Sequence, residues 1–320
     1  MSEFVSLRTK HVLELSPKAP FNFDATMHHP DNFPSADNKW QSGILWQTML
    51  WETEPVGLKL ENRGTVDLPK LTVSVFTEEE PTQSFLDNLI EEINYRYNLR
   101  FDLTEFNHRF EDDPQLGPII DRWRGMRRGC CGSFYESLIV TIVLQNATVR
   151  RSVDMMQTLF ENYGTLLSYD NRELFCFWSP EAIQITSEQD LRDLKIGYRA
   201  KSIKKVTEAF VSKEIDECQF RTKTLDEQRE ALLKLHGIGP ASVGYILGEL
   251  THISPWEQNI YSKLFFNIDT TTPMPVEQLM EFFEHRFGKY KMLAVHYIWE
   301  DLFWKRKNEK ISWLEQLIRL

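Results

Sequence analysis

The chain has 320 residues, of which 42% are hydrophobic and 26% charged, and this length and composition are typical of a globular protein with two or three packed modules. No apolar run approaches the length of a membrane span, and the N-terminal residues lack the layout of a signal peptide, so we expect an intracellular protein, cytoplasmic or nuclear, without membrane contact. The formal net charge of −10 argues against a protein that coats nucleic acid by bulk electrostatics, although basic side chains cluster locally.

The four cysteines give no sign of a metal centre. They lie at Cys130, Cys131, Cys176 and Cys218, a spacing that matches no zinc or iron–sulfur ligand set. Adjacent cysteines are also poor disulfide partners. We therefore expect free thiols, no metal and no cofactor.

The first hundred residues contain short β-prone runs separated by Pro, Gly, Asn and Asp. A helix is expected from about Gln83 to Tyr97, where apolar residues recur at helical spacing. Residues 1–100 are therefore predicted to form an α+β domain, an antiparallel sheet plus a covering helix. The expected strands are His11–Leu15, Gly43–Glu52, Val56–Glu61 and Lys70–Phe76.

From about Phe101 onward the β signals fade, and the fold class of residues 101–320 is predicted to be mainly α, a bundle of short helices. Gly164 stops one helix, and Ser179 followed by Pro180 starts another. The expected helices are Phe134–Leu144, Ser152–Gly164, Ser187–Leu194, Ala200–Ser212, Leu225–Leu235, Ala241–Leu250, Glu257–Phe266, Val276–Phe287, Tyr290–Lys305 and Ile311–Leu320.

The sharpest local signal is LLKLHGIGPASVGYIL, residues 232–247. Two apolar helices flank a turn in which Gly237 and Gly239 leave no Cβ, so another backbone can approach closely. Ile238 is expected to plug the gap between the helices, and Pro240 suits the first helical position. Free N–H groups of the turn and of the next helix then face outward, which predicts a phosphate site; a plain helical hairpin is the alternative.

At these residues the chain resembles the helix-hairpin-helix (HhH-GPD) DNA glycosylases, whose hairpin reads Leu-Pro-Gly-Val/Ile-Gly. His236 stands here in place of the usual Pro. The resemblance implies a damaged double-stranded DNA partner, a monomer, and the larger three-domain branch that includes bacterial 3-methyladenine glycosylase II and 8-oxoguanine glycosylase. No cysteine follows Cys218, so the iron–sulfur cluster of the smaller branch is absent. The similar segments are Phe134–Gly164, Leu191–Phe210, Pro255–Phe266 and Arg286–Trp304.

The resemblance also implies a catalytic carboxylate. The family places an Asp about twenty residues beyond the hairpin, at the start of a helix and just before an Asn/His and apolar pair. Glu257 occupies that position here, with Asn259 as the family's second polar, DNA-binding position. A carboxylate there would stabilise the positive charge that builds on the sugar. The residue is Glu rather than Asp and the loop is slightly short, so a plain helix cap is the alternative.

The bifunctional members of the family use a lysine two residues beyond the second hairpin glycine as a Schiff-base nucleophile. Ala241 occupies that position in this chain. The residues therefore favour a monofunctional enzyme that uses water.

Further contacts with DNA are expected on both sides of the helix turn near residue 146. Gln145 and Asn146 match the position that fills the gap left by a flipped base, although Asn146 is equally explained as a helix cap. Arg150 and Arg151 would hold the kinked backbone. The candidate walls of the base pocket are Trp256, Phe23 and Tyr245, with a place in the protein core as the alternative for each.

Together these residues predict a base-excision DNA glycosylase that flips a damaged base, with an alkylated purine as the leading substrate. Two alternatives stay open. One is a bifunctional oxidised-purine glycosylase with lyase activity that uses an unidentified lysine. The other is a non-catalytic lesion-binding protein, which the Glu-for-Asp change supports.

Overall fold

A computed structural model describes residues 3–28, 34–129, 132–268 and 272–317. The expectation for Cys130 and Cys131 falls outside these ranges. Of the other two cysteines, Cys176 is a buried free thiol and Cys218 an exposed one. The described residues contain no helix that is both long and apolar enough to cross a bilayer.

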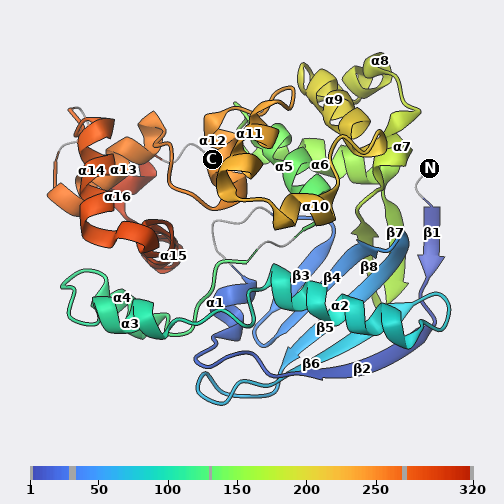
Figure 1. The fold of residues 1–320 in the computed structure, drawn as a ribbon, viewed down its shortest axis with the longest axis horizontal. Helices are drawn as coiled ribbons and strands as arrows, with labels where there is room; N and C mark the ends of the chain where they lie inside the picture. Colours follow the sequence, from blue (N-terminus) through green and yellow to red (C-terminus); the bar gives the residue numbers. More distant parts are fainter. Residues whose placement is uncertain (1–2, 29–33, 130–131, 269–271, 318–320) are drawn as a thin grey trace.

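The N-terminal part is built on an antiparallel sheet, as the sequence predicts, and the sheet has a fifth strand, β3 (Asn38–Gln41), that was not predicted (Figure 1). Its apolar face packs against helix α2 (Gln83–Arg96), whose Phe85, Leu89 and Ile93 point into the shared core. The four predicted strands and the predicted helix are therefore confirmed. In spatial order the strands are β2 (Thr9–Leu15), β6 (Leu71–Thr77), β5 (Glu54–Asn62), β4 (Ile44–Trp51) and β3 (Asn38–Gln41), and the short α1 (Phe23–Met27) precedes β3.

A second, three-stranded sheet covers the other face of the first, and the sequence did not predict it. It joins β1 (Glu3–Ser6), in parallel pairing, to the hairpin β7 (Thr165–Tyr169) and β8 (Arg172–Cys176). Gly57 makes the close packing possible, because a Cβ there would lie 2.7 Å from the ring of Tyr169. The prediction of a mainly α region from residue 101 is confirmed, although the sequence did not indicate this short hairpin within it.

The first group of helices surrounds one core that includes Leu138, Ile142, Leu159 and Ile203. Helix α5 runs through it, capped by Ser133 at its start and ending at Gln145. The group comprises α5 (Phe134–Leu144), α6 (Val149–Tyr163), α7 (Pro180–Gln184), α8 (Glu188–Leu191), a π-helical segment Arg192–Ile196, α9 (Arg199–Val211), α10 (Glu217–Thr222), α11 (Leu225–Leu233) and α12 (Pro240–Leu247).

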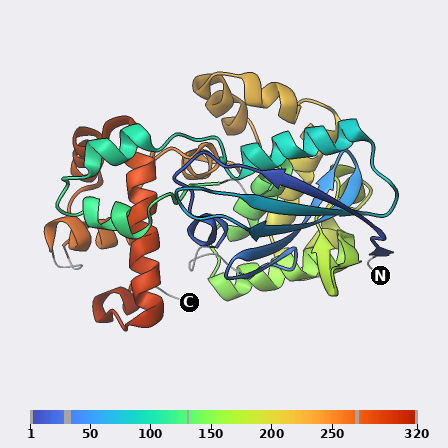
Figure 2. The ribbon, with the colours of Figure 1, turned by 90° about the horizontal axis from the view of Figure 1, so that it is seen from below.

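The second group of helices has a core of its own, centred on Phe106, Tyr261, Phe283 and Tyr297. The long α15 stands out in Figure 2, with α3 and α4 packed beside it. The short helices α3, α4 and α10 were not predicted. Each buries only one or two large apolar side chains, which is too few to give a helical pattern in the sequence. The group comprises α3 (Thr104–Phe110), α4 (Gly117–Arg122), α13 (Pro255–Phe266), α14 (Val276–Phe287), a 3-10 turn Gly288–Tyr290, α15 (Lys291–Asn308) and α16 (Ser312–Glu315).

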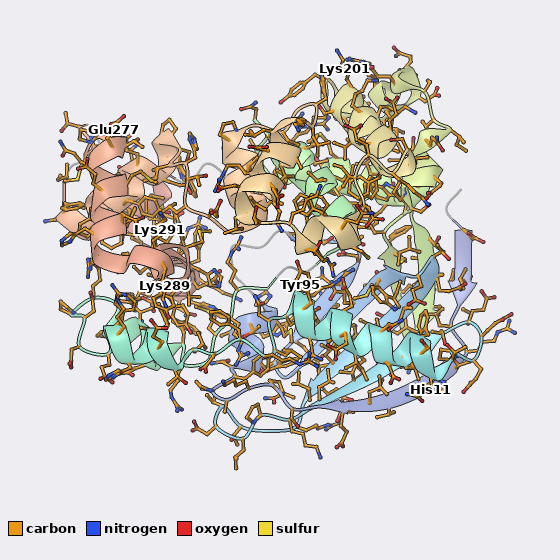
Figure 3. All side chains as sticks on the ribbon, viewed as in Figure 1. His11, Tyr95, Lys201, Glu277, Lys289 and Lys291 are labelled. Carbon is orange, nitrogen blue, oxygen red and sulfur yellow. The ribbon has the colours of Figure 1, made fainter. Side chains whose placement is uncertain are left out.

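A cluster of charged side chains joins the sheet region to the first helical group. On α2, Glu92 accepts a hydrogen bond from Arg96 at 2.7 Å and a paired one from Arg221 of α10 at 2.6 and 2.9 Å. Arg221 also lies over the ring of Tyr95, which Figure 3 labels on α2 beneath α10. Glu136, at the start of α5, lies 3.8 Å from Arg96. Burial raises the pKa of Glu136 to about 7, and Arg96 offsets only part of this rise.

The raised pKa of Glu136 predicts how stability depends on pH. The folded protein holds this proton to about pH 7, whereas the ordinary pKa of a glutamate in an unfolded chain is 4.5, so the group's contribution is lost as pH rises between these values. Glu136→Gln keeps the neutral form, and Gln still fits the capping box with Ser133. We expect the variant to gain on the order of 1–3 kcal/mol relative to the parent between pH 5 and pH 8.

Urea unfolding at pH 5, 6, 7 and 8 measures this difference. Glu161→Gln, on the exposed face of α6, is the matched control and should show no such trend. A Glu136→Gln difference that stays constant with pH would contradict the assignment.

Candidate active site

The hairpin between α11 and α12 has the geometry expected from its glycines. Gly237 adopts a left-handed φ of 84°, and a Cβ on it would lie 2.3 Å from Ser202 Oγ. Gly239 is the N-cap of α12 and faces open space, since a Cβ added to it would have no neighbouring atom within 4 Å. Ile238 is only 6% exposed and packs into the first helical core. The turn therefore presents backbone to solvent while its apolar residue anchors it.

The turn is held by two side chains from other helices. Gln145, directly after α5, donates from Nε2 to the Gly237 carbonyl at 2.8 Å and to Ser242 Oγ at 3.2 Å. Ser202 of α9 lies with Oγ 3.2 Å from His236 Nδ1. The structure thus brings Gln145 to the hairpin, and its amide is engaged there.

Asn146 lies on the exposed turn beside Gln145, with a left-handed φ of 49°. Its Nδ2 donates to the hydroxyl of Tyr198 at 3.3 Å. Tyr198 is 52% exposed, a large aromatic side chain that is absent from the residues predicted for the site. Nothing local in the sequence distinguishes it; it lies at the N-cap of α9, directly after Gly197, whose φ is 66°. Arg199, behind it, donates to the carbonyls of Val143 and Gln145 and so fixes this turn.

The two predicted phosphate-binding arginines start α6 and are both exposed. Arg151 donates to the carbonyl of Lys195, whose φ of 61° interrupts the π-helical segment. Arg150 makes no hydrogen bond or ion pair with the described residues. The structure therefore leaves Arg150 available, and uses Arg151 to hold the segment that leads to Tyr198.

Glu257 lies at the third position of α13 and closes a capping box. Its Oε2 accepts from the backbone N–H of Ser254 at 2.8 Å, and its own N–H donates to Ser254 Oγ at 3.3 Å. Within the described part of the chain, Oε1 makes no hydrogen bond. The cap thus fixes one carboxylate oxygen and leaves the second one to act elsewhere.

Aromatic rings adjoin this carboxylate. Trp256, 38% exposed, stacks on Trp299 of α15 with ring centroids 5.3 Å apart and planes at 15°. Trp299 donates from Nε1 to the hydroxyl of Tyr261 at 2.8 Å. Burial and the nearby charge of Glu257 raise the pKa of Tyr261 well above its ordinary value. A flat apolar surface therefore begins one residue before Glu257.

The remaining expected site residues have mixed positions. Tyr245 of α12 is 59% exposed, whereas Phe23 is 2% exposed and belongs to the core of the first sheet. Asn259 donates from Nδ2 to the carbonyl of Pro255 in its own helix, and its Oδ1 is buried without a partner. Ala241 is exposed at the start of α12. The described residues hold no group of three or more His, Cys, Asp or Glu side chains that fits a metal ion.

The hairpin and the carboxylate belong to different helical groups, connected by the segment 248–254. Arg128, in the segment between α4 and α5, contacts the hairpin's second helix, where its Nη2 donates to the carbonyl of Tyr245 at 3.0 Å. The arrangement can hold a phosphate backbone on outward amides and present a carboxylate and an aromatic face from the neighbouring group.

Comparison with known proteins identifies the family of the chain. Residues 139–309, more than half of the chain, match the family described as "HhH-GPD superfamily base excision DNA repair protein". A curated relative, the "Probable N-glycosylase/DNA lyase" of Methanothermobacter thermautotrophicus, is 27% identical over 178 residues. That match covers 50% of this chain and 56% of the relative, so the chain spans little more than half of the relative's length.

Two solved structures share the fold. A 3-methyladenine DNA-glycosylase from Archaeoglobus fulgidus superposes with a TM-score of 0.74 at 16% identity, covering 91% of this chain and 99% of that one. The 8-oxoguanine glycosylase/lyase of Clostridium acetobutylicum, in complex with DNA containing cytosine opposite 8-oxoG, gives 0.67 at 17% identity, covering 92% and 98%. At these identities the likeness establishes the fold alone.

The two hairpin glycines are predicted to differ in their tolerance of a side chain. Gly237→Ala places a Cβ against Ser202 at a left-handed φ, and should lower the free energy of unfolding by roughly 1–3 kcal/mol. Gly239→Ala, with a φ of −105° and open space, should change it by less than about 0.5 kcal/mol. Chemical denaturation of both variants measures the contrast. Equal effects would mean that the turn is not braced by Ser202.

Proposed function

Because the chain belongs to the HhH-GPD superfamily of base excision DNA repair proteins, we propose that it is a DNA N-glycosylase acting on damaged double-stranded DNA. The observation that carries the proposal is the hairpin, with its outward backbone and the Gln145 and Ser202 braces. In the proposed complex the hairpin amides bind a phosphate of one strand. The protein acts as a monomer, and the helical region 101–320 carries the site.

The chemistry is assigned to Glu257. Breaking the N-glycosidic bond leaves positive charge on the deoxyribose, and a carboxylate beside the sugar stabilises that charge. The Ser254 N–H holds Glu257 Oε2 at 2.8 Å, which orients the carboxylate before DNA binds. A water then attacks the sugar carbon, the base leaves with the bonding electrons, and the product is an abasic site.

An alkylated purine is the substrate class we propose. Alkylation gives the base a positive charge, and a cation is attracted to the face of an indole. Trp256, stacked on Trp299 next to the carboxylate, offers such a face, and exposed Tyr245 offers a second ring. Ala241 at the Schiff-base position supports a water-dependent, monofunctional reaction. The name of the archaeal relative favours lyase activity as the second candidate.

The test of the function is a panel of duplexes that each carry one lesion, incubated with the protein and run with and without hot alkali. We expect strand cleavage only after alkali, with alkylated purines cut first. Cleavage without alkali would indicate the lyase, and no cleavage in either lane across the panel would favour a non-catalytic binding protein.

Glu257→Gln tests the carboxylate in the same assay. Gln still fits the capping box, so the fold should persist, but the negative charge is lost. We expect excision to slow by about 100-fold or more, while binding to the lesion duplex is kept. Glu277→Gln, at the start of α14, is the matched control. Near-normal turnover of Glu257→Gln would remove this residue from the mechanism.

Base flipping makes a separate prediction. Extruding a base costs a few kcal/mol, which a side chain entering the gap offsets in part. We assign that role to Asn146, held by Tyr198, so Asn146→Ala should weaken binding to an abasic duplex more than to an intact one. Arg150→Ala should weaken both equally and lower the salt slope by about one. Fluorescence anisotropy measures both; equal losses for Asn146→Ala would make it only a turn residue.

A further inference from the structure

His236 is the residue of the hairpin that the proposed function has not used. It directly precedes Gly237 and is exposed to solvent, three residues before Gly239, where an added Cβ would meet open space. Its Nδ1 lies 3.2 Å from Ser202 Oγ, and Ser202 is only 5% exposed on α9. The imidazole is therefore held from one side by a buried hydroxyl, while the residue itself remains at the surface.

This contact survives a change of charge on the ring. A serine hydroxyl can donate to a neutral Nδ1 or accept from a protonated one, because its hydrogen rotates to suit. In both states the nitrogen opposite, Nε2, carries a hydrogen that it can donate outward. Protonation therefore changes the charge of His236 without requiring the ring to leave its place.

The surrounding charges do not duplicate this behaviour. Lys201 precedes Ser202 on α9, and Figure 3 shows it on the outer side of that helix. Lys234 ends α11 two residues before His236, and Arg150 and Arg151 begin α6 beyond the Gln145 turn. Helix α12 carries no charged residue from Pro240 to Leu247. Lysine and arginine stay protonated from pH 5 to pH 8, so they add attraction for phosphate but no pH dependence.

We propose that His236 is a phosphate ligand of the hairpin, and that its protonation makes duplex binding tighten as the pH falls. The inference rests on the proposed DNA-binding function and deepens it. The backbone amides of the turn offer dipoles only, whereas a protonated imidazole beside them adds a charge-assisted hydrogen bond. Of the side chain types at the turn, histidine is the one that can act as a proton-dependent ligand.

The test compares His236→Gln and His236→Lys with the parent protein. An undamaged duplex serves as the probe, so that catalysis does not enter, and fluorescence anisotropy gives Kd at pH 8 and pH 5.5 and at several salt concentrations. The parent should bind roughly three- to tenfold more tightly at pH 5.5, the size of one charge-assisted contact. His236→Gln should lose this gain, and His236→Lys should bind tightly at both pH values.

The salt dependence gives an independent readout. At pH 5.5 the slope of log Kd against log salt should be steeper by about one for the parent than for His236→Gln, since one more phosphate is neutralised. His108→Gln, an exposed histidine on α3 paired with Glu111, is the matched control and should behave as the parent. Thermal melts at both pH values verify that each variant is folded.

Two results would overturn the inference. A His236→Gln variant that keeps the parent's pH dependence and salt slope shows that the proton is taken up elsewhere. A His236→Lys variant no tighter than His236→Gln at pH 8 shows that a charge at this position does not reach phosphate. If the parent fails to bind duplex at either pH, the DNA-binding function itself fails, which is a different outcome.

Discussion

The hydrogen bond from the Gln145 amide to the Gly237 carbonyl joins the two turns on which the proposed DNA contacts depend. One turn carries Asn146 and Tyr198, and the other is the glycine hairpin. Helix α5 ends at Gln145, and its first turn lies in the charged cluster with α2 and α10. A single helix therefore ties the hairpin to the sheet region. Because the donor directly follows the packed helix α5, this bond helps to hold the two turns in one relative position before DNA binds.

The capping box at α13 is compatible with both explanations of Glu257, a helix cap and a catalytic carboxylate. As a cap, the side chain satisfies the Ser254 N–H, which would otherwise lie unpaired near the start of the helix. As a catalytic group, it requires one free oxygen and a fixed direction. The cap consumes Oε2 and fixes the direction, so the two roles do not compete. An aspartate can close the same box, as Asp190 does with Ser187 at the start of α8, so the cap alone does not account for the Glu-for-Asp change.

The sequence predicted the elements that carry strong periodicity. Strands β2, β4, β5 and β6, helix α2 and helices α5, α6, α9 and α11–α15 follow their apolar patterns closely, whereas the short β3 was not predicted. The β7–β8 hairpin was missed although Asp170 and Asn171, both at left-handed φ, mark its turn. Its strands are short, and they form only because residues far away in sequence, at β1 and around Gly57, complete the sheet and its packing. Such long-range partners leave no local pattern.

The sequence indicated candidate site residues, but it could not indicate how their side chains contact one another. The hairpin, Gln145, Asn146 and Glu257 could be named from motif and spacing, because each position is fixed by its neighbours along the chain. The packing of α5 against α9 and α12 decides which atom of Gln145 contacts the hairpin. The same packing brings Asn146 within hydrogen-bond distance of Tyr198. Phe23 was named as a pocket wall on its aromatic character alone, and its placement in the sheet core follows from the α1 contact with β-strands.

Net charge is a poor guide to the field at the hairpin because it does not say where on the protein the charges lie. Glu92 binds Arg96 and Arg221, Asp113 binds Arg286 at 2.8 Å, and Asp301 binds Lys305 at 2.7 Å. A paired carboxylate contributes little field beyond a Debye length of about 8–10 Å. Phosphate at the hairpin therefore meets neutral amides and nearby exposed cations rather than the charge of −10 carried by the whole chain. Amide dipoles release no counterions, so a hairpin built on them binds the DNA backbone with an affinity that depends only weakly on salt. One added positive charge at the turn, such as a protonated histidine, therefore makes a large relative change in that salt dependence.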